Sequence, residues 1–394
     1  MRLICSICPV LSIVIGMIFL TGCSNFYHPT VIVTNTFPSD TANKYYLKKV
    51  GDISLQLDSV TLNIVQTVQY LNEENNENLL LLNEFSNAIY FYDLSTGLIN
   101  KVLSFDKKKV GNLQGFYYMS KDSVWLFSYD SRSLCLFTPN DITKYHRKRL
   151  INQDDKEIMA PYPYVSTMSP ISIRHGSIWT SGLVSGETNM ETSENRPGII
   201  SIDMNTFKMS YYVNYPEMYQ KGNWGGGLTY RLPYYTMVGD SLIISFSASH
   251  ELAVLNLKNG TEHSFFAGSK YSKEIVSFHS PKKRASSINK DAAWKWYLNS
   301  FSYEGVLYDK YRNVYYRFVR LPLENNCSAD GINKKRVSVI ILDSKMRYVG
   351  ESLLDSRKTY IPGNSFVSIS GLNIQTLTNN ENEIVYEQYM PFED

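Results

Sequence analysis

One short stretch combines the residue types that recognise ligands. Residues 222–227 read Gly-Asn-Trp-Gly-Gly-Gly and are followed by Tyr230 and Arg231. Glycines let a backbone approach a ligand closely, and the flat face of Trp224 can stack on a sugar or a peptide. We therefore take Trp224, Tyr230 and Arg231 as candidate ligand-binding residues. The structural alternative is an ordinary flexible connection between two folded units.

A second aromatic stretch lies about 70 residues further on, where Trp294 and Trp296 flank a lysine. Indole rings on a loop could line the rim of a binding groove. They could equally pack an inserted loop onto the rest of the fold, because large aromatic side chains bury much apolar area. The sequence leaves both interpretations open.

Four arginines lie within or beside strand-like runs: Arg174, Arg231, Arg317 and Arg320. A guanidinium cannot lose its charge, so a buried arginine needs a carboxylate or a ligand anion beside it. Pairing with Asp or Glu between neighbouring structural units explains these residues without a ligand. The functional alternative is an anion-binding cluster at a place where loops converge.

No enzyme motif is present. The chain lacks a Gly-x-Ser-x-Gly nucleophile turn, a His-Glu-x-x-His zinc helix and a phosphate-binding Gly-x-x-x-x-Gly-Lys-Ser/Thr loop. The 6 histidines are dispersed, with no pair at metal-ligand spacing. We predict no metal and no other cofactor. A glycan hydrolase or lyase remains the alternative, with two carboxylates from distant segments about 5 Å or about 6.5–9.5 Å apart.

The scaffold for these residues is built from short strand-like runs. Pairs of apolar runs recur, each closed by a turn that Asp or Asn opens at positions 93, 141, 203, 256 and 343. Such side chains bond to the backbone two residues on. Recurring strand pairs are typical of a β-propeller, whose blades hold about four strands each. Two β-sandwiches are the alternative.

We therefore predict an all-β, six-bladed β-propeller over residues 44–394. A sixth unit is expected between Ser365 and Tyr389. The run from Val50 to Leu57 can supply the strand that closes the ring, which removes exposed sheet edges.

The N-terminus carries residues suited to covalent lipid attachment. An apolar run from Leu3 ends in Leu20-Thr21-Gly22-Cys23, and small residues before a cysteine fit a signal peptidase. The pattern resembles a bacterial lipoprotein signal. It predicts a signal peptide at 1–22, a diacylglyceryl thioether on Cys23 and a tether over 23–43. Two acyl chains anchor a protein stably. A retained membrane-spanning helix is the alternative.

This signal, the chain length and the run Tyr-Asp-Lys-Tyr-Arg-Asn-Val-Tyr-Tyr-Arg at 308–317 together suggest a family. The sequence resembles uncharacterised six-bladed propeller lipoproteins of gut-type anaerobic bacteria, related in architecture to TolB-like propellers. The resemblance implies an outer-membrane lipoprotein with a binding role, and it supplies no catalytic residues. No acidic residue occurs in Ser24-Asn25-Phe26-Tyr27, which in that group points to a periplasm-facing position.

Composition narrows the function further. The net charge is +2, whereas a nucleic-acid binder carries a basic surplus, so we expect no nucleic-acid partner. Beyond Cys23, the mature chain has only Cys135 and Cys327, and a disulfide between them is allowed but not required. We expect a monomeric, non-enzymatic binding protein for a peptide, a glycan or a protein partner. An assembly factor is a further alternative, which predicts an exposed apolar patch without a pocket.

Overall fold

The computed structural model describes residues 30–38, 43–74, 76–141, 144–150, 161–183, 196–225, 230–278, 289–323 and 335–394. The predicted signal peptide, Cys23 and Cys327 lie outside these ranges. Within them the fold is all-β, as predicted, with three short helices: α1 (Lys107–Val110), α2 (Met218–Lys221) and α3 (Lys290–Leu298). None of the helices in the described ranges has the length and apolar composition to cross a membrane.

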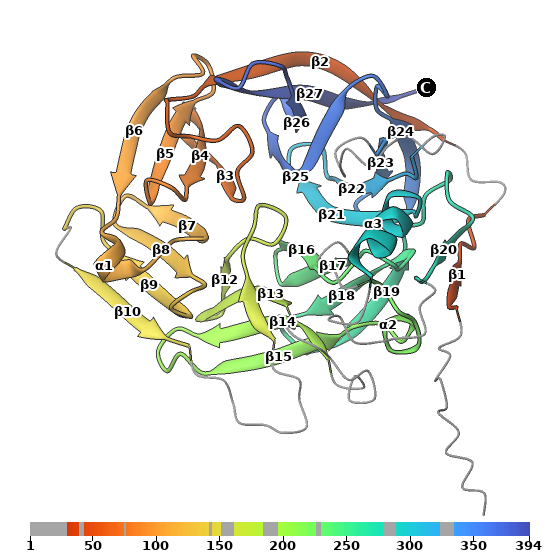
Figure 1. The fold of residues 1–394 in the computed structure, drawn as a ribbon, viewed down its shortest axis with the longest axis horizontal. Coiled ribbons are helices and arrows are strands. Elements are labelled where there is room, and N and C mark those ends of the chain that lie inside the picture. Colours follow the sequence, from red (N-terminus) through yellow and green to blue (C-terminus); the bar gives the residue numbers. More distant parts are fainter. Residues whose placement is uncertain are drawn as a thin grey trace, which may run out of the picture.

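The strands form sheets arranged around a central axis in a propeller-like ring (Figure 1). The first sheet contains β3 (Val68–Glu73), β4 (Asn76–Asn83), β5 (Ala88–Asp93) and β6 (Ile99–Ser104), and the second contains β7 (Gly115–Ser120), β8 (Ser123–Ser128), β9 (Ser133–Phe137) and β10 (Tyr145–Arg149). The third contains β11 (Tyr162–Tyr164), β12 (Ser172–Arg174), β13 (Ser177–Leu183), β14 (Pro197–Asp203) and β15 (Met209–Asn214), and the fourth contains β16 (Pro233–Val238), β17 (Ser241–Phe246), β18 (Glu251–Asn256) and β19 (Glu262–Phe266).

An eight-stranded sheet completes the ring. Its order is β21 (Ser302–Asp309), β22 (Val314–Arg320), β23 (Val337–Leu342), β24 (Tyr348–Leu353), β2 (Tyr45–Gln56), β27 (Glu383–Glu393), β26 (Gly371–Leu377) and β25 (Thr359–Ser368). The N-terminal strand β2 pairs with the C-terminal strand β27 along its length, so the predicted closure by terminal strands is confirmed.

The structure corrects the prediction of six separate blades. Strand pairing gives four blade-like sheets and one eight-stranded sheet. Within the latter, β24 and β2 are joined by a single parallel pair, Tyr45 with Gly350. Gly350 makes this junction possible, because a Cβ at that position would lie 1.9 Å from the carbonyl oxygen of Tyr45. The repeat pattern could not predict a contact that depends on one glycine far from its partner.

The recurring turns have the predicted chemistry. In four of the five, the opening side-chain oxygen accepts a hydrogen bond from the backbone N–H two residues on: Asp93 (2.8 Å), Asp203 (3.0 Å), Asn256 (2.9 Å) and Asp343 (2.9 Å). The turns of Asp93, Asp203 and Asn256 join the last two strands of a blade-like sheet, that of Asp343 joins β23 to β24 in the eight-stranded sheet, and Asp141 lies between β9 and β10. The polar residue therefore marks the same corner of each unit.

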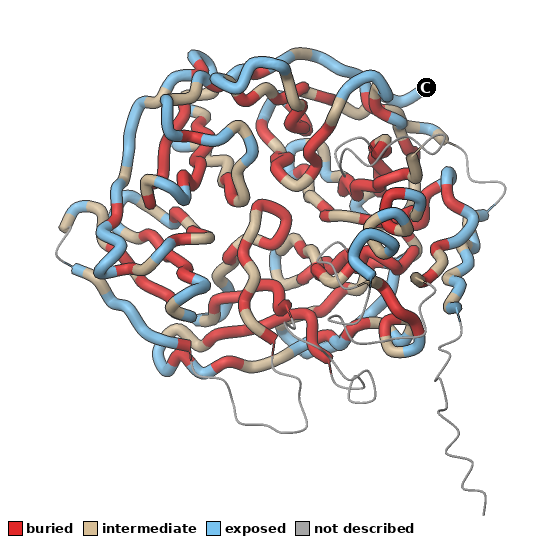
Figure 2. Tube along the Cα trace, in the orientation of Figure 1, coloured by how far each residue is buried: buried red, intermediate tan, exposed pale blue. Residues whose placement is uncertain are grey.

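Neighbouring sheets bury their apolar faces against each other. Between the first and second sheets, for example, Leu80 and Phe91 share a core with Phe116 and Leu126. Cys135 belongs to this core and carries a free, buried thiol, as expected for a small hydrophobic residue. Figure 2 shows that the buried positions follow the sheets, while exposed positions follow the rim.

A short hairpin of the third sheet reaches into the centre of the ring. This central hairpin (residues 165–171) separates β11 from β12, which both pair with β13. Thr167 N–H donates to the carbonyl of Gln66 (3.1 Å), ahead of the first sheet, and Tyr235 N–H of the fourth sheet donates to the carbonyl of Met168 (3.1 Å). Met168 is 1% exposed. The protein's own chain therefore fills this part of the axis.

Part of the segment predicted as a tether forms a strand. The strand β1 (Ile32–Thr34) pairs antiparallel with β20 (Glu274–Val276). The side-chain amide of Asn35 donates to the carbonyls of Ser269 and Ser272, each at 2.7 Å. The chain therefore contacts the ring from about residue 31, before the predicted domain boundary at 44.

Candidate functional site

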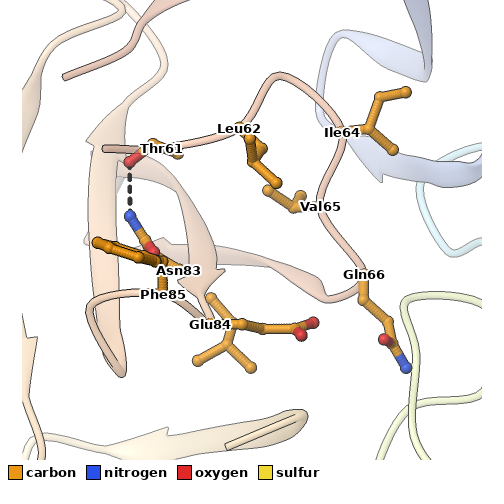
Figure 3. A pocket seen from close by; sticks show the side chains of 9 residues that line it. Thr61, Leu62, Ile64, Val65, Gln66, Asn83, Glu84 and Phe85 are labelled. Atoms are coloured by element: carbon orange, nitrogen blue, oxygen red, sulfur yellow. Dashed lines mark hydrogen bonds between the residues drawn. The ribbon is translucent and has the colours of Figure 1, made fainter. Parts of the chain in front are cut away.

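A cavity of about 340 Å³ lies beside the first sheet (Figure 3). Two segments form it: residues 61–66, which lead from β2 into β3, and the end of β4 with its turn into β5. The lining residues are Thr61, Leu62, Ile64, Val65, Gln66, Leu82, Asn83, Glu84 and Phe85. We call this cavity the loop pocket.

Hydrogen bonds hold the two segments of the loop pocket together. The Asn83 amide donates to Thr61 Oγ1 (2.8 Å), and Asn83 Oδ1 accepts from Ser86 N–H (3.0 Å). Thr61 in turn donates to Asp58 Oδ1 (2.6 Å). Because Asn83 is buried and satisfied on both sides, it fixes the turn and the connection in one arrangement.

The opening of the loop pocket is strongly apolar. Three large apolar side chains of its lining are exposed to solvent, namely Leu62 (73%), Ile64 (43%) and Phe85 (75%), and so is Val60 (41%), which precedes the lining residue Thr61. We call these four residues the apolar mouth. Apolar side chains scattered singly on a surface need no explanation, but a group gathered at a cavity marks a binding surface. Covering a side chain such as Phe85 with a partner stabilises a complex by up to about 1.5–3 kcal/mol.

Two polar side chains, Glu84 and Gln66, also line the loop pocket. Figure 3 shows the Glu84 carboxylate extending towards Gln66. Burial raises the pKa of the Glu84 carboxyl above its ordinary value. Burial also raises the pKa of the nearby Tyr164, and the Glu84 charge raises it further. The Gln66 amide donates to the carbonyl of Val165 (3.1 Å), so the central hairpin borders the pocket.

The predicted aromatic residues meet in one cluster, but in a packed interior. Trp224 is 5% exposed and Tyr230 is fully buried. Their rings lie 5.4 Å apart, and Trp296 lies 4.9 Å from Tyr230. The indole N–H groups donate to backbone carbonyls, that of Trp224 to Met218 (2.9 Å) and that of Trp296 to Val276 (3.1 Å).

The glycine and the helix beside this cluster serve the same packing. A Cβ at Gly225 would lie 3.2 Å from the Trp296 ring, so the glycine lets the loop approach the indole. Trp294 stacks on Tyr297 in α3, with ring centroids 5.6 Å apart. In this arrangement the aromatic residues attach α3 and the glycine-rich loop to the ring, which was the structural alternative.

The four candidate arginines do not gather at one site. Arg174 is half-exposed and pairs with Asp240 (2.5 Å), between the third and fourth sheets. Arg320 is buried and pairs with Glu304 (2.9 Å). Pairing with carboxylates thus accounts for both.

Arg317 has neutral partners. It is fully buried, its Nη1 donates to the carbonyl of Ala267 (2.9 Å), its Nη2 donates to that of Ser249 (2.8 Å), and it stacks over the Tyr303 ring at 3.8 Å. Burial lowers the pKa of Arg317 to about 10. The fourth candidate, Arg231, is half-buried just ahead of β16 and lies near Arg196, which the sequence did not single out.

No metal site is evident in the part of the chain that the structure describes, where no three His, Cys, Asp or Glu side chains gather. A second cavity, of about 320 Å³, lies at the other end of the first sheet, and its lining includes Asp52, Glu77 and Asp93. Of these, the Asp93 carboxylate already accepts hydrogen bonds from the backbone N–H groups of Ser95 (2.8 Å) and Thr96 (3.0 Å) in its own turn.

The sequence reasoning missed the loop pocket. One signal could have found it: Phe85 stands in a tight turn between Asn83 and Asn87, where polar residues are the rule. The residues of the connecting segment gave no such signal, since Leu62, Ile64 and Val65 read as an ordinary short apolar run.

Comparison with known proteins agrees with the propeller-like ring. The structure is similar to the crystal structure of a DUF4221 family member from Bacteroides vulgatus, with a TM-score of 0.73, 20% identity, and coverage of 89% of this chain and 99% of that one. It is also similar to a "putative exported protein" from Bacteroides fragilis, with a TM-score of 0.54, 11% identity, and coverage of 91% and 98%. No curated protein compared with the chain matches its sequence.

These similarities define an all-β, propeller-like class of protein. A family model described as a domain of unknown function, DUF4221, matches residues 46–353. The chain therefore belongs to the DUF4221 family.

Proposed function

We propose that this protein is a non-enzymatic binding protein of the bacterial cell envelope, which captures a peptide or protein partner by seating an apolar side chain in the loop pocket. One observation carries the proposal: three exposed large apolar side chains of the apolar mouth line a cavity of about 340 Å³, and the fourth, Val60, adjoins the lining residue Thr61. Leaving such side chains in water is unfavourable, so a partner that covers them gains binding energy.

The size and lining of the loop pocket favour a side chain over an oligosaccharide. Its volume is at the lower end of the range for small-molecule sites, about 300–1,000 Å³. Three of the four mouth residues are aliphatic, and they suit an apolar side chain better than a sugar. The Glu84 carboxylate in the lining can accept a hydrogen bond from an amide or amine next to that side chain. The proposed partner is thus a peptide or protein that presents an apolar side chain next to a hydrogen-bond donor.

The lining also argues against the glycan-cleaving alternative at this site. Glu84 is the single carboxylate among the lining residues of the loop pocket. Glycoside hydrolysis by the common mechanisms needs two. A binding role requires no second carboxylate.

The proposal includes a six-bladed architecture and a lipid anchor. The two halves of the eight-stranded sheet, β21–β24 and β25–β27 with β2, each have the four-strand meander of the other units and act as two blades fused at Gly350. Residues 1–22 act as the signal, and lipidated Cys23 holds a monomer at the outer membrane, facing the periplasm. The Cys23-Ser24-Asn25 junction after the apolar run supports the anchor.

Labelling with a palmitate analogue in growing cells tests the anchor. The wild-type chain should take up the label and Cys23→Ala should not. Equal labelling, or none in the wild type, would reject lipidation. Protease treatment of intact cells tests the orientation, since rapid digestion would place the ring on the cell surface.

Selection from a phage-displayed peptide library tests the binding function. Peptides enriched on the wild-type protein should share an apolar residue and should lose binding to Phe85→Ser and Leu62→Ser. Met119→Ser is the matched control, because Met119 is 56% exposed on β7 and does not line the pocket. Enriched peptides that bind all four proteins equally would place the binding surface elsewhere.

A further inference from the structure

The hydrogen-bonding groups that remain free in the loop pocket are acceptors. The lining side chains of Thr61, Asn83 and Gln66 already donate hydrogen bonds within the protein. Among the described residues, none donates to the Glu84 carboxylate or to the side-chain oxygen of Gln66. The Glu84 carboxylate extends towards Gln66, as Figure 3 shows. A ligand in the pocket therefore meets two acceptors and has to supply the donors itself.

The negative charge of Glu84 has no counter-charge in the described part of the chain. The lining of the loop pocket contains no lysine, arginine or histidine. Burial is the cause that raises the pKa of the Glu84 carboxyl, whereas a neighbouring cation would lower it. Lys107 lies outside the lining and donates to the backbone carbonyl of Phe85 (3.1 Å). The cavity thus combines an apolar opening with one carboxylate whose charge is not offset.

A ligand that fills the loop pocket changes the surroundings of this carboxylate. In the free protein Glu84 is exposed, and water solvates its charge. Because Glu84 adjoins Phe85 in the same turn, a partner seated on the apolar mouth displaces that water. Removing water from a carboxylate is costly unless a donor of opposite charge replaces it. A cationic donor is therefore a better occupant than a neutral amide, and charge-assisted hydrogen bonds are also the stronger ones.

We propose that the loop pocket recognises the free N-terminus of a peptide whose first residue is apolar. The α-ammonium group bonds to the Glu84 carboxylate and to the side-chain oxygen of Gln66, and the first side chain packs in the apolar mouth. This inference rests on the proposed function and specifies which part of a peptide enters the pocket.

One residue at a peptide N-terminus supplies both features that the pocket requires. Its ammonium group, which is charged at neutral pH, and its side chain are attached to the same carbon. An internal apolar residue brings only neutral amides to Glu84. A free amino acid brings a second carboxylate, which the lining has no basic residue to receive.

A competition between free and blocked N-termini tests this recognition. A mixture of random synthetic peptide amides, prepared with free and with acetylated N-termini, is passed over the immobilised mature chain, and mass spectrometry identifies the retained peptides. The variants are Glu84→Gln, which keeps the shape and removes the charge, and Phe85→Ser. The matched control is Glu262→Gln, because Glu262 is exposed on β19 and does not line the pocket.

Free-amine peptides with an apolar first residue should be retained by the wild type and by Glu262→Gln and lost from Phe85→Ser. In calorimetry with one retained peptide, acetylation and Glu84→Gln should each weaken the Kd about 10- to 100-fold, the loss expected for hydrogen bonds to a charged group. Acetylation should weaken binding to Glu84→Gln much less, because both changes remove the same ion pair.

The outcomes separate this inference from the proposed function. Equal binding of free and acetylated peptides would overturn N-terminal recognition, and peptide binding at the loop pocket would stand if Phe85→Ser still abolished it. Retention that is independent of Phe85, or no retention at all, would reject the proposed function together with this inference. Free leucine is the last probe, and binding as tight as that of the peptide would refute the proposal in favour of an amino-acid site.

Discussion

Replacing Arg317 with methionine should weaken the contact between the fourth sheet and the eight-stranded sheet and so destabilise the fold. Arg317 lies on β22, and its guanidinium reaches across to the carbonyls of Ala267 and Ser249 and to the Ser245 hydroxyl (3.1 Å). It is fully buried and covers the Tyr303 ring. Methionine has a similar length and fills similar space, but it offers no donor. The substitution therefore removes the hydrogen bonds and leaves most of the packing.

The magnitude follows from the acceptors left behind. Each of the four acceptors, which include the Phe246 carbonyl at 3.4 Å, loses a partner at about 1–3 kcal/mol. Removing a buried charge returns part of its desolvation cost, so we expect about 2–4 kcal/mol of net destabilisation. Arg317→Lys should also destabilise, because one ammonium group cannot reproduce the spread of a guanidinium.

Urea denaturation followed by tryptophan fluorescence measures the effect. The midpoint should fall clearly for Arg317→Met and stay unchanged for Arg357→Met, whose guanidinium is exposed. If Arg317→Met unfolds at the wild-type midpoint, the guanidinium does not hold the two sheets together, and the reasoning is refuted.

Three further predictions concern the ring. Burial lowers the pKa of His250 to about 4, so between pH 6.5 and pH 4 the folded state binds fewer protons than the unfolded state. The stability of the folded state should therefore fall as the pH falls through that window. His250→Gln should flatten the dependence of the melting temperature on pH. Gly350→Ala should cost about 1–3 kcal/mol in urea denaturation, because the new Cβ collides with the Tyr45 carbonyl. Gly363→Ala is its control, with nothing within 4 Å, and an equal loss in both would contradict the close approach at Gly350. Met168→Ala should cost about 2–5 kcal/mol, since it empties space at the ring axis, and a loss below about 1 kcal/mol would mean that the central hairpin is not packed.

The features that the sequence predicted are those set by local chemistry. Asp93 and Asp203 open turns because their side chains reach their own backbone, and this information is contained in a few residues. The closing strand was also predictable, because a strand-like run at each end of a repeating array has few other places to pair.

The features that it did not predict depend on partners far along the chain. Thr167 reaches the axis because Gln66 lies there, about a hundred residues earlier, and no local pattern encodes that contact. Trp224 and Trp296 were candidate ligand-binding residues because of their aromatic side chains, yet tertiary packing brings their rings together in the core. Phe85 was visible as an aromatic residue in a polar turn, but its neighbours in the pocket come from another segment.

The affinity of one selected peptide for the wild type and for Phe85→Ser tests the central claim most directly. Isothermal titration calorimetry should show a Kd about 10- to 150-fold weaker for Phe85→Ser, the equivalent of losing the burial of one phenylalanine. Met119→Ser should bind as the wild type does, since Met119 lies outside the loop pocket. Equal Kd values for the wild type and Phe85→Ser would contradict the claim that the apolar mouth is the binding surface.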